Sequence, residues 1–544
     1  MLINRWMKAL PFTIMFLLLI LASALLTGTV SAHSSLVQTI PEPNSQLQEA
    51  PDVVSITFNE RLDQGLYYLK VLDQQGDAVT KQAATMNADK TGLELKIPKL
   101  GEGIYVISYH VISADGHPVD GSYPMTIGNP PQSGNTPLPS NLTHQHDGVK
   151  GMDTATLLQY LSRGLWYATM LALTGWVLWL RLPGSGGIRG EAYLTKWTSN
   201  LQRVHLVALL LLIFTHVEDL LGEGGLSDAG QLFTGTSIGI SWLLLLLLTI
   251  IGFVVLQKSV WLDIAWALAL LAVESFNGHA ISFSPQIASV VLDFIHLAAA
   301  ALWVGGLLLL AVQWRNKANQ MGTLLQAFSR MALISIIILS LTGTASLLIF
   351  LPSLNYLFYT QWGIMMLVKI GLVLLVIGTG VCLRVAMKKQ RESHLRGWFK
   401  VDFGLMIAIV LLVGLITYMA PLPPNEPLRW HVMGETAHMT AEITPKAQGS
   451  NTFITKVWLP ETAGPPKQVL MLLHYENDKH IAPLEVPLEL FEDQAAGEAF
   501  GGFIQYSYKA VGAYLPLRGE WSLEVRVMDA NDNEKPYKKE FMVY

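Results

Sequence analysis

Residues 287–313 read IASVVLDFIHLAAAALWVGGLLLLAVQ, an apolar run that contains an aspartate, Asp293, and a histidine, His296. The run exceeds the roughly 20 residues that an α-helix needs to cross the hydrocarbon core of a bilayer. A charged side chain costs about 2.5–3.5 kcal/mol at the centre of such a helix on insertion scales, so polar groups there usually face a bundle interior and mark a site. The stretch therefore predicts a membrane helix with a functional face.

Seven further stretches of similar character surround this one. The eight predicted spans are roughly 155–180, 203–221, 238–256, 260–279, 287–313, 331–351, 361–384 and 402–420. The composition agrees, because 51% hydrophobic and 14% charged residues are too apolar a mixture for a soluble chain of 544 residues. We expect an α-helical, eight-span membrane bundle over residues 153–420.

Lysine and arginine are distributed unevenly between the loops that connect these spans. The loops at 222–237, 280–286 and 352–360 contain none, whereas the alternate loops are basic. Basic loops stay on the cytoplasmic side of a membrane. The bias predicts a multi-pass protein of the cell membrane whose N-terminal and C-terminal regions are both extracytoplasmic.

The regions outside the bundle are polar and are predicted to form separate domains. Residues 33–128 and 421–544 contain short alternating apolar runs between turn signals, which is typical of β-sandwiches. Residues 129–152 are rich in Pro, Asn and Ser and predict a linker. Residues 1–32 have a basic start, an apolar stretch and small residues before His33, so we expect a cleaved signal peptide, with an uncleaved anchor helix as the alternative.

Cleavage before His33 would create a chelating group from its imidazole and the new α-amine. The segment SADGHPVDG offers Asp115 and His117 from one turn, which completes three nitrogens and one oxygen. Neutral imidazoles with a carboxylate in a tetragonal set suit Cu(II). Taken alone, the same residues are also compatible with a surface histidine and an Asx turn. The single cysteine, Cys382, excludes a cysteine-rich metal cage.

The stretches AHSSLVQTIPEPNSQLQEAPDVVSITFNERL and YVISYHVISADGHPVDGSYPMTIG resemble the CopC family of copper-binding proteins. The resemblance implies that His33, Asp115 and His117 bind Cu(II) and that Glu60 lies near the metal. An N-terminal histidine with a second imidazole also occurs in copper monooxygenases. Oxygen activation there needs an open equatorial position, which Asp115 would fill, so we expect a binding protein and not an enzyme.

Three histidines of the predicted spans lie in the outer leaflet: His216, His279 and His296. We expect them to form a cluster through which copper enters, with hydrogen bonds between helices as the alternative role. Asp293 is predicted to form an ion pair with Lys369, and His205, closer to the inner side, is expected to be structural.

The stretches DFIHLAAAALWVGGLLLL, ISIIILSLTGTASLLIFLPS and YTQWGIMMLVKIGLVLLVIGTG are similar to CopD membrane proteins. A CopC–CopD fusion with a further extracellular domain, here similar to the YtkA-like family, resembles the YcnJ-type copper transport proteins. The resemblance implies copper import across the plasma membrane, with copper ions, the bilayer and extracellular copper chaperones as partners and no nucleic acid. A copper resistance module without import and a bis-histidine haem electron carrier stay as alternatives.

Overall fold

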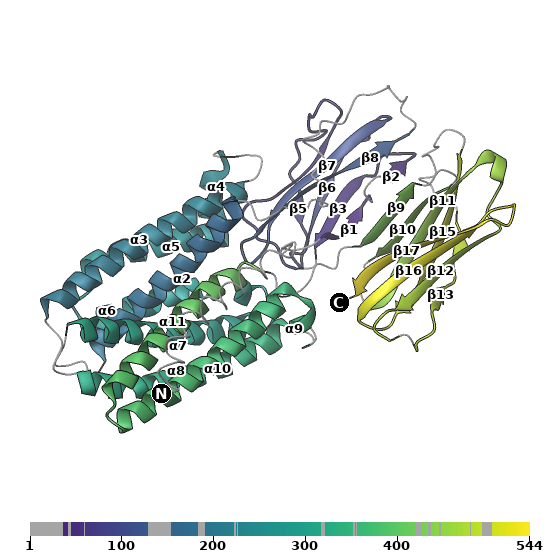
Figure 1. The fold of residues 1–544 in the computed structure, drawn as a ribbon. Helices are drawn as coiled ribbons and strands as arrows, with labels where there is room; N and C mark the ends of the chain where they lie inside the picture. Colours follow the sequence, from purple (N-terminus) through teal and green to yellow (C-terminus); the bar gives the residue numbers. More distant parts are fainter. Residues whose placement is uncertain are drawn as a thin grey trace. The chain divides into compact units, whose positions relative to one another are not determined.

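The computed structural model describes residues 36–41, 45–58, 60–128, 154–182, 191–221, 225, 227–316, 321–351, 354, 356–419, 421, 427–433, 437–444, 446, 448–478, 480–491 and 503–543. His33, the predicted signal peptide 1–32 and the predicted linker 129–152 lie outside this part of the chain. Contacts divide the chain into two units. One unit contains the helices together with the short segment Ala114–Pro118, and the other contains the β-strands (Figure 1).

Each predicted span coincides with an α-helix in the first unit. These helices are α2 (Thr154–Arg181), α3 (Ala192–Leu221), α5 (Ser237–Val255), α6 (Val260–Glu274), α7 (Gln286–Arg315), α8 (Met321–Phe350), α10 (Gln361–Lys388) and α11 (Glu392–Ile416). Shorter pieces are α4 (Ala229–Gly235), α9 (Tyr356–Tyr359) and the 3₁₀ turn η2 (His279–Ile281).

Six of these helices, α3, α5, α7, α8, α10 and α11, are long and apolar enough to cross a membrane. The other two differ in kind. α2 is long but rich in polar and aromatic residues, and α6 has only 15 residues, which rise about 22 Å at 1.5 Å per residue. The number of eight spans therefore stays a prediction.

The predicted span 260–279 ends earlier than expected. α6 stops at Glu274, and Gly278 then adopts φ 74°, a left-handed conformation that stops a helix and that glycine adopts at little cost. His279 consequently begins the separate turn η2.

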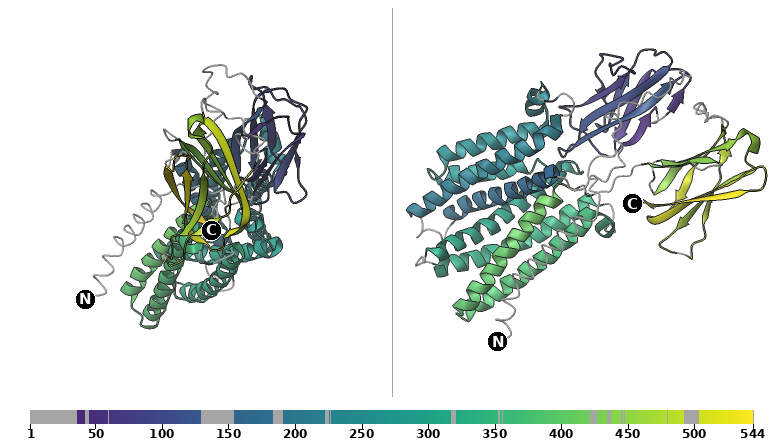
Figure 2. Two further views of the ribbon diagram at one scale, coloured as in Figure 1. Left: turned by 90° about the vertical axis from the view of Figure 1, so that its right-hand side faces the viewer. Right: turned by 45° about the horizontal axis from the view of Figure 1, so that its top comes forward.

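Helix α2 lies at the centre of the bundle. It packs against α3, α6, α7 and α11, and Figures 1 and 2 show it running between α3 and α11. Two contacts involving glycine hold it close to its neighbours. A Cβ on Gly175 would lie 1.8 Å from the backbone oxygen of Ala301 in α7, and one on Gly414 of α11 would lie 2.5 Å from Cα of Gly164. Gly305 of α7 faces Gly175, and such contacts between small residues let two helices approach closely.

Substitution of Gly175→Ala should separate α2 from α7, because the contacted atom is backbone and cannot rotate away. We expect a loss of about 1–3 kcal/mol or more, the usual cost of overpacking. The measurement is the thermal unfolding midpoint of the detergent-solubilised chain. Gly378→Ala in α10 is the matched control, because its added Cβ meets nothing within 4 Å. Equal midpoints for the two variants would contradict the proposed close contact.

The N-terminal part of the second unit is a β-sandwich, as predicted. Its strands are β1 (Leu36–Ile40), β2 (Ser45–Leu47), β3 (Val53–Phe58), β4 (Tyr68–Leu72), β5 (Thr85–Met86), β6 (Gly92–Lys96), β7 (Gly103–Ile112) and β8 (Pro118–Ile127). They form two four-stranded sheets, in the orders β1-β3-β6-β5 and β2-β8-β7-β4. Alternate residues of β3, including Val54 and Ile56, enter one shared core.

The C-terminal part also contains two sheets around one core. Its strands are β9 (Leu428–Met433), β10 (His438–Thr444), β11 (Gly449–Pro460), β12 (Gln468–Tyr475), β13 (Leu484–Val486), β14 (Glu489–Leu490), β15 (Phe503–Leu515), β16 (Gly519–Met528) and β17 (Glu534–Val543). The sheet orders are β14-β15-β11-β10-β9 and β13-β12-β16-β17. Phe453 and Trp521 are among the fully buried side chains of this core.

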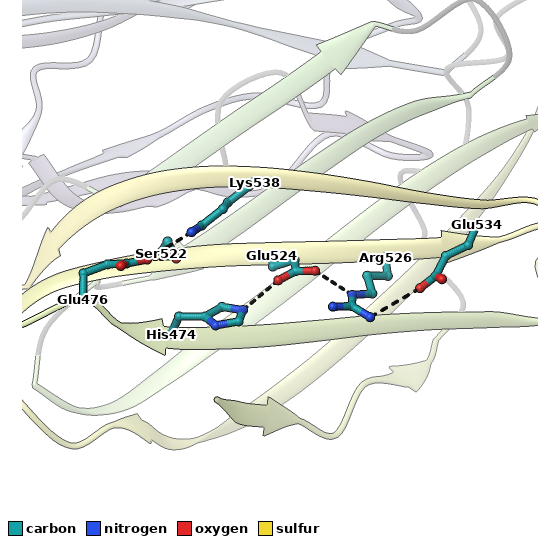
Figure 3. Close-up of polar contacts among 7 residues, drawn as sticks. All are labelled: His474, Glu476, Ser522, Glu524, Arg526, Glu534 and Lys538. Carbon is teal, nitrogen blue, oxygen red and sulfur yellow. Dashed lines mark hydrogen bonds and ion pairs between the residues drawn. The ribbon is translucent and has the colours of Figure 1, made fainter. Parts of the chain in front are cut away.

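A chain of polar contacts crosses β12, β16 and β17 (Figure 3). The carboxylate of Glu524 contacts Nε2 of His474 at 2.7 Å and accepts a hydrogen bond from Nε of Arg526 at 2.6 Å. In a second set of contacts, the carboxylate of Glu476 accepts hydrogen bonds from Ser522 and Lys538. Burial raises the pKa of Glu524, but the hydrogen bonds from Arg526 and His474 outweigh it, so the pKa is lowered overall.

The lowered pKa of Glu524 predicts acid sensitivity of this sheet. A carboxylate with a lowered folded-state pKa adds stability above its unfolded pKa of about 4.3, and this contribution disappears as the pH falls through the folded pKa. Hydrogen exchange of β12 and β16, corrected for intrinsic rates, should therefore accelerate as the pH falls below about 4.3. Glu524→Gln should remove this pH dependence, whereas the exposed control Glu489→Gln should retain it. If hydrogen exchange in Glu524→Gln depended on pH as it does in the wild-type chain, Glu524 would not be the group responsible.

Candidate functional site

The segment Ala114–Pro118 carries two of the predicted copper ligands, Asp115 and His117. Gly116 between them has φ +87°, a conformation that allows the chain to turn within three residues. Both flanking side chains are buried, and Nε2 of His117 lies 4.0 Å from Oδ2 of Asp115. The D-G-H sequence thus brings a carboxylate and an imidazole together, as its spacing predicts.

Asp115 also contacts a histidine of the helical unit. Nδ1 of His279, at the start of η2, lies 2.9 Å from Oδ2 of Asp115. Because a carboxylate oxygen accepts, Nδ1 carries the proton and donates it to Asp115. The other ring nitrogen, Nε2, is buried and has no hydrogen-bond partner among the described residues. In the neutral ring this nitrogen carries the lone pair through which imidazole binds a metal.

A cavity of about 30 Å³ is lined by His117 and by residues of the helices. It is large enough for a water molecule or a single ion. Its polar lining includes His117, His216, Asp219, Glu274, Arg163 and Tyr418. Imidazole nitrogens and carboxyl oxygens, both present in this lining, are ligand types that copper binds.

His216 is the second histidine in the lining of this cavity. It lies on α3, and its Nδ1 is 2.9 Å from the backbone oxygen of Leu212, one turn earlier. A carbonyl can only accept, so Nδ1 carries the proton and Nε2 does not. That Nε2 is buried and lacks a hydrogen-bond partner in the described part of the chain. The helix backbone itself therefore fixes the tautomer of His216.

Glu274 is the buried carboxylate of the cavity. It ends α6 and accepts a hydrogen bond of 3.4 Å from Nδ2 of Asn277, while Trp166 and Tyr167 of α2 lie close to it. Only 5% of its surface is exposed. A buried carboxylate facing a cavity with a lone-pair imidazole offers oxygen and nitrogen ligands to one cation.

Tyr418 is a site residue that sequence reasoning missed. Its ring packs edge-on against His117 at 5.2 Å and against His216 at 6.0 Å between centroids. Its hydroxyl donates to Oε1 of Gln159 at 2.9 Å. Its position just after α11 carried no signal beyond the common occurrence of tyrosine at membrane interfaces.

His296 lies between a different pair of helices. Its Nδ1 is 2.8 Å from Oγ1 of Thr342 on α8, and that hydroxyl donates to the backbone oxygen of Ile338. The described lining of the cavity includes His117 and His216 but not His296. Asp293 and Lys369 attract each other electrostatically, but ion pairs within 4 Å among the described residues do not include them.

Glu60 is half-buried in the loop after β3 and belongs to the second unit. Its role near copper stays a prediction, as does that of His33. Within the described ranges, no group of three His, Cys, Asp or Glu side chains lies close enough to hold a metal ion. The predicted ligand set also includes His33, which lies outside the described residues.

Comparison with protein families matches part of each unit. A CopC domain model matches residues 36–128, and the model described as copper resistance protein D, CopD, matches residues 322–416. The chain joins a CopC domain to a CopD domain. The CopD match covers α8, α10 and α11, whereas His216 and His279 lie before it.

Several known proteins are similar to this chain. The copper transport protein CutJ of Bacillus subtilis (strain 168) is 26% identical over 481 residues, which cover 84% of this chain and 85% of CutJ. Protein YobA of Escherichia coli (strain K12) is 29% identical over 115 residues, covering 21% of this chain and 92% of YobA.

Two solved structures are similar to part of this chain. CopC from Methylosinus trichosporium OB3b is 33% identical with a TM-score of 0.17, covering 18% of this chain and 93% of its own. PcoC, a methionine-rich copper resistance protein from Escherichia coli, is 22% identical with a TM-score of 0.16, covering 18% and 99%.

Proposed function

We propose that this chain captures Cu(II) outside the cell and imports copper across the plasma membrane. The observation that carries the proposal is the cavity that His117 shares with His216 and Glu274. His117 is a predicted Cu(II) ligand, and the other two residues belong to helices of the bundle. The similarity to a copper transport protein along most of the chain also supports copper transport.

Capture would use the α-amine and imidazole of His33 with Asp115 and His117. An α-amine has a pKa of about 8 and so releases its proton to a metal more readily than a lysine does. Glu60 would lie near this metal without being one of these ligands. The extracytoplasmic placement of this site follows from the basic loops, and extracellular copper chaperones are the expected donors of the ion.

Transfer would then pass the ion to the lone pairs of the helical unit. Nδ1 of His279 and Nδ1 of His216 each donate a hydrogen bond, so in the neutral rings both Nε2 atoms carry the lone pairs and can bind copper without first losing a proton. His296 would supply a third ligand position between α7 and α8. The bilayer blocks the ion elsewhere, so that the ion would cross the membrane only along this path.

The small cavity beside His216 supports an ion at this position better than a haem. Cofactor pockets typically measure about 300–1,000 Å³, an order of magnitude more than the cavity beside His216. The absorption spectrum of the purified chain checks this, since a Soret band would establish haem. A copper resistance module would bind the ion at the same ligands without moving it, so uptake measurements separate it from an importer.

The capture site predicts a loss of Cu(II) affinity on substitution of Asp115→Asn or His117→Phe. Removing a ligand should cost more than the roughly 10–100-fold that the loss of an outer-shell partner costs. Mass spectrometry of the mature N-terminus followed by a Cu(II) titration with electron paramagnetic resonance measures it. His480→Ala, at an exposed position of the C-terminal domain, is the control. A mature chain that does not begin at His33 would refute this ligand set.

Import predicts copper accumulation inside proteoliposomes that contain the full-length chain. His216→Phe should lower the uptake rate at least about tenfold, because the phenyl ring keeps the volume but removes the lone pair. His394→Phe, at the far end of α11, is the control and should leave uptake unchanged. Wild-type protein that binds Cu(II) but gives no uptake above empty vesicles would favour the resistance module.

A further inference from the structure

A second pocket, of about 360 Å³, lies between the start of α3 and the end of α7. Its volume falls within the roughly 300–1,000 Å³ that is typical of ligand pockets. Four of its lining residues stand at positions i, i+3, i+4 and i+7 of α3, which keeps them on one helix face. With the two residues from the end of α7, the lining includes Tyr193, Lys196, Trp197, Asn200, Arg315 and Asn316. We call this space the basic pocket.

The polar groups of the basic pocket suit an anion. Lys196 and Arg315 are cations, and the amides of Asn200 and Asn316 and the indole of Trp197 can donate further hydrogen bonds. The described lining contains no acidic side chain. Ion pairs within 4 Å in the described part of the chain include neither Lys196 nor Arg315. Two positive charges therefore line one pocket without a carboxylate between them.

A hydrogen bond beside the basic pocket joins the two helices that form it. The hydroxyl of Tyr193 on α3 donates to Oε1 of Gln313 on α7 at 2.7 Å. Gln313 is only 1% exposed, so this bond is shielded from water. It holds the two helix ends together, and the long side chains of Lys196 and Arg315 can therefore contact one and the same anion.

The lengths of α3 and α7 place the basic pocket at the level of lipid headgroups. Each helix has 30 residues and rises about 45 Å at 1.5 Å per residue. The hydrocarbon core is about 30 Å thick, and the bilayer with its headgroups about 40–45 Å. Arg315 ends α7 and Lys196 lies near the start of α3, so both reach the headgroup region. The basic loops predict that this is the cytoplasmic side.

The pocket-lining face of α3 continues as an exposed apolar surface towards the middle of the helix. Val204 and Val207 follow Asn200 at spacings of four and seven residues, on the same helix face. Their side chains are 50% and 62% exposed. One face of α3 thus places cationic and polar groups at the headgroup level and apolar groups at the level of acyl chains.

We propose that the basic pocket binds the phosphate headgroup of an anionic phospholipid of the inner leaflet, with an acyl chain along Val204 and Val207. Basic pockets between membrane helices on the cytoplasmic side suit such headgroups. A free phosphate ion would satisfy Lys196 and Arg315 but would make no use of the apolar surface beside them. The bound lipid would bridge α3 and α7. This proposal goes beyond copper transport and does not depend on it.

The double variant Lys196→Gln, Arg315→Gln tests the basic pocket. Native mass spectrometry of the full-length chain in detergent, titrated with phosphatidylglycerol, measures the affinity. We expect binding about 30-fold weaker than in the wild-type chain, because each basic residue strengthens contact with an anionic lipid about fivefold. Lys388→Gln, Lys389→Gln is the matched control, because it removes two exposed charges from the same predicted side outside the pocket lining. The control should bind as the wild-type chain does.

The thermal unfolding midpoint gives a second measurement and shows whether the double variant is folded. Both substituted side chains are exposed, so without lipid its midpoint should match that of the wild-type chain. Phosphatidylglycerol should raise the midpoint of the wild-type chain and the control but not that of the double variant, since a ligand stabilises the state that binds it.

Three results would overturn the proposal. An equal loss of phosphatidylglycerol binding in Lys388→Gln, Lys389→Gln would indicate attraction by surface charge in general. Phosphatidylcholine, which has no net charge, would contradict an anion-binding pocket if it bound the wild-type chain as tightly as phosphatidylglycerol. Inorganic phosphate would replace the lipid as the occupant if it raised the midpoint equally and displaced phosphatidylglycerol.

Discussion

The site depends on one constraint, which is that a buried imidazole N–H needs an acceptor. In this chain the acceptors are a carboxylate for His279, a helix carbonyl for His216 and hydroxyls whose own protons are already donated for His205 and His296. Each acceptor holds the proton on one nitrogen and leaves the other with a lone pair. His205 and His216 of α3, His296 of α7 and His279 of η2 each donate one such hydrogen bond.

The positions of these histidines depend in turn on how α2 is held. Its glycine contacts with α7 and α11 allow backbones to touch, so α2 can lie inside the bundle and still present Trp166 to α3. A larger residue at either contact would move the indole away from His205. The packing of small residues and the chemistry of the polar face are therefore linked through one helix.

The apolar runs predicted every long helix, because burial in hydrocarbon leaves a strong compositional signal. They misplaced several ends. α3, α8 and α11 each begin about ten residues before the predicted span, since helices continue into the basic interface where hydropathy no longer marks them. The D-G-H turn was predictable from its spacing. Tyr418 and Trp166 were not, because their roles depend on which helices meet, and the sequence of one helix does not contain that information.

His205 shows the same limit of prediction from the sequence of one helix. Taken alone it is an ordinary structural histidine near the inner end of an apolar run, as expected from the sequence. The two nitrogens are distinguished only by Thr249, whose hydroxyl donates to Leu245 and so can only accept from Nε2 of His205.

The short helix α6 has a consequence for any ion that enters here. Its roughly 22 Å falls short of a hydrocarbon core about 30 Å thick. As a predicted span it creates a hydrophobic mismatch, which local thinning of the lipid relieves at modest cost. Glu274, at its end, would then sit at the bottom of a depression in the membrane surface, and the dielectric barrier that a charged species must cross would be narrower there than elsewhere.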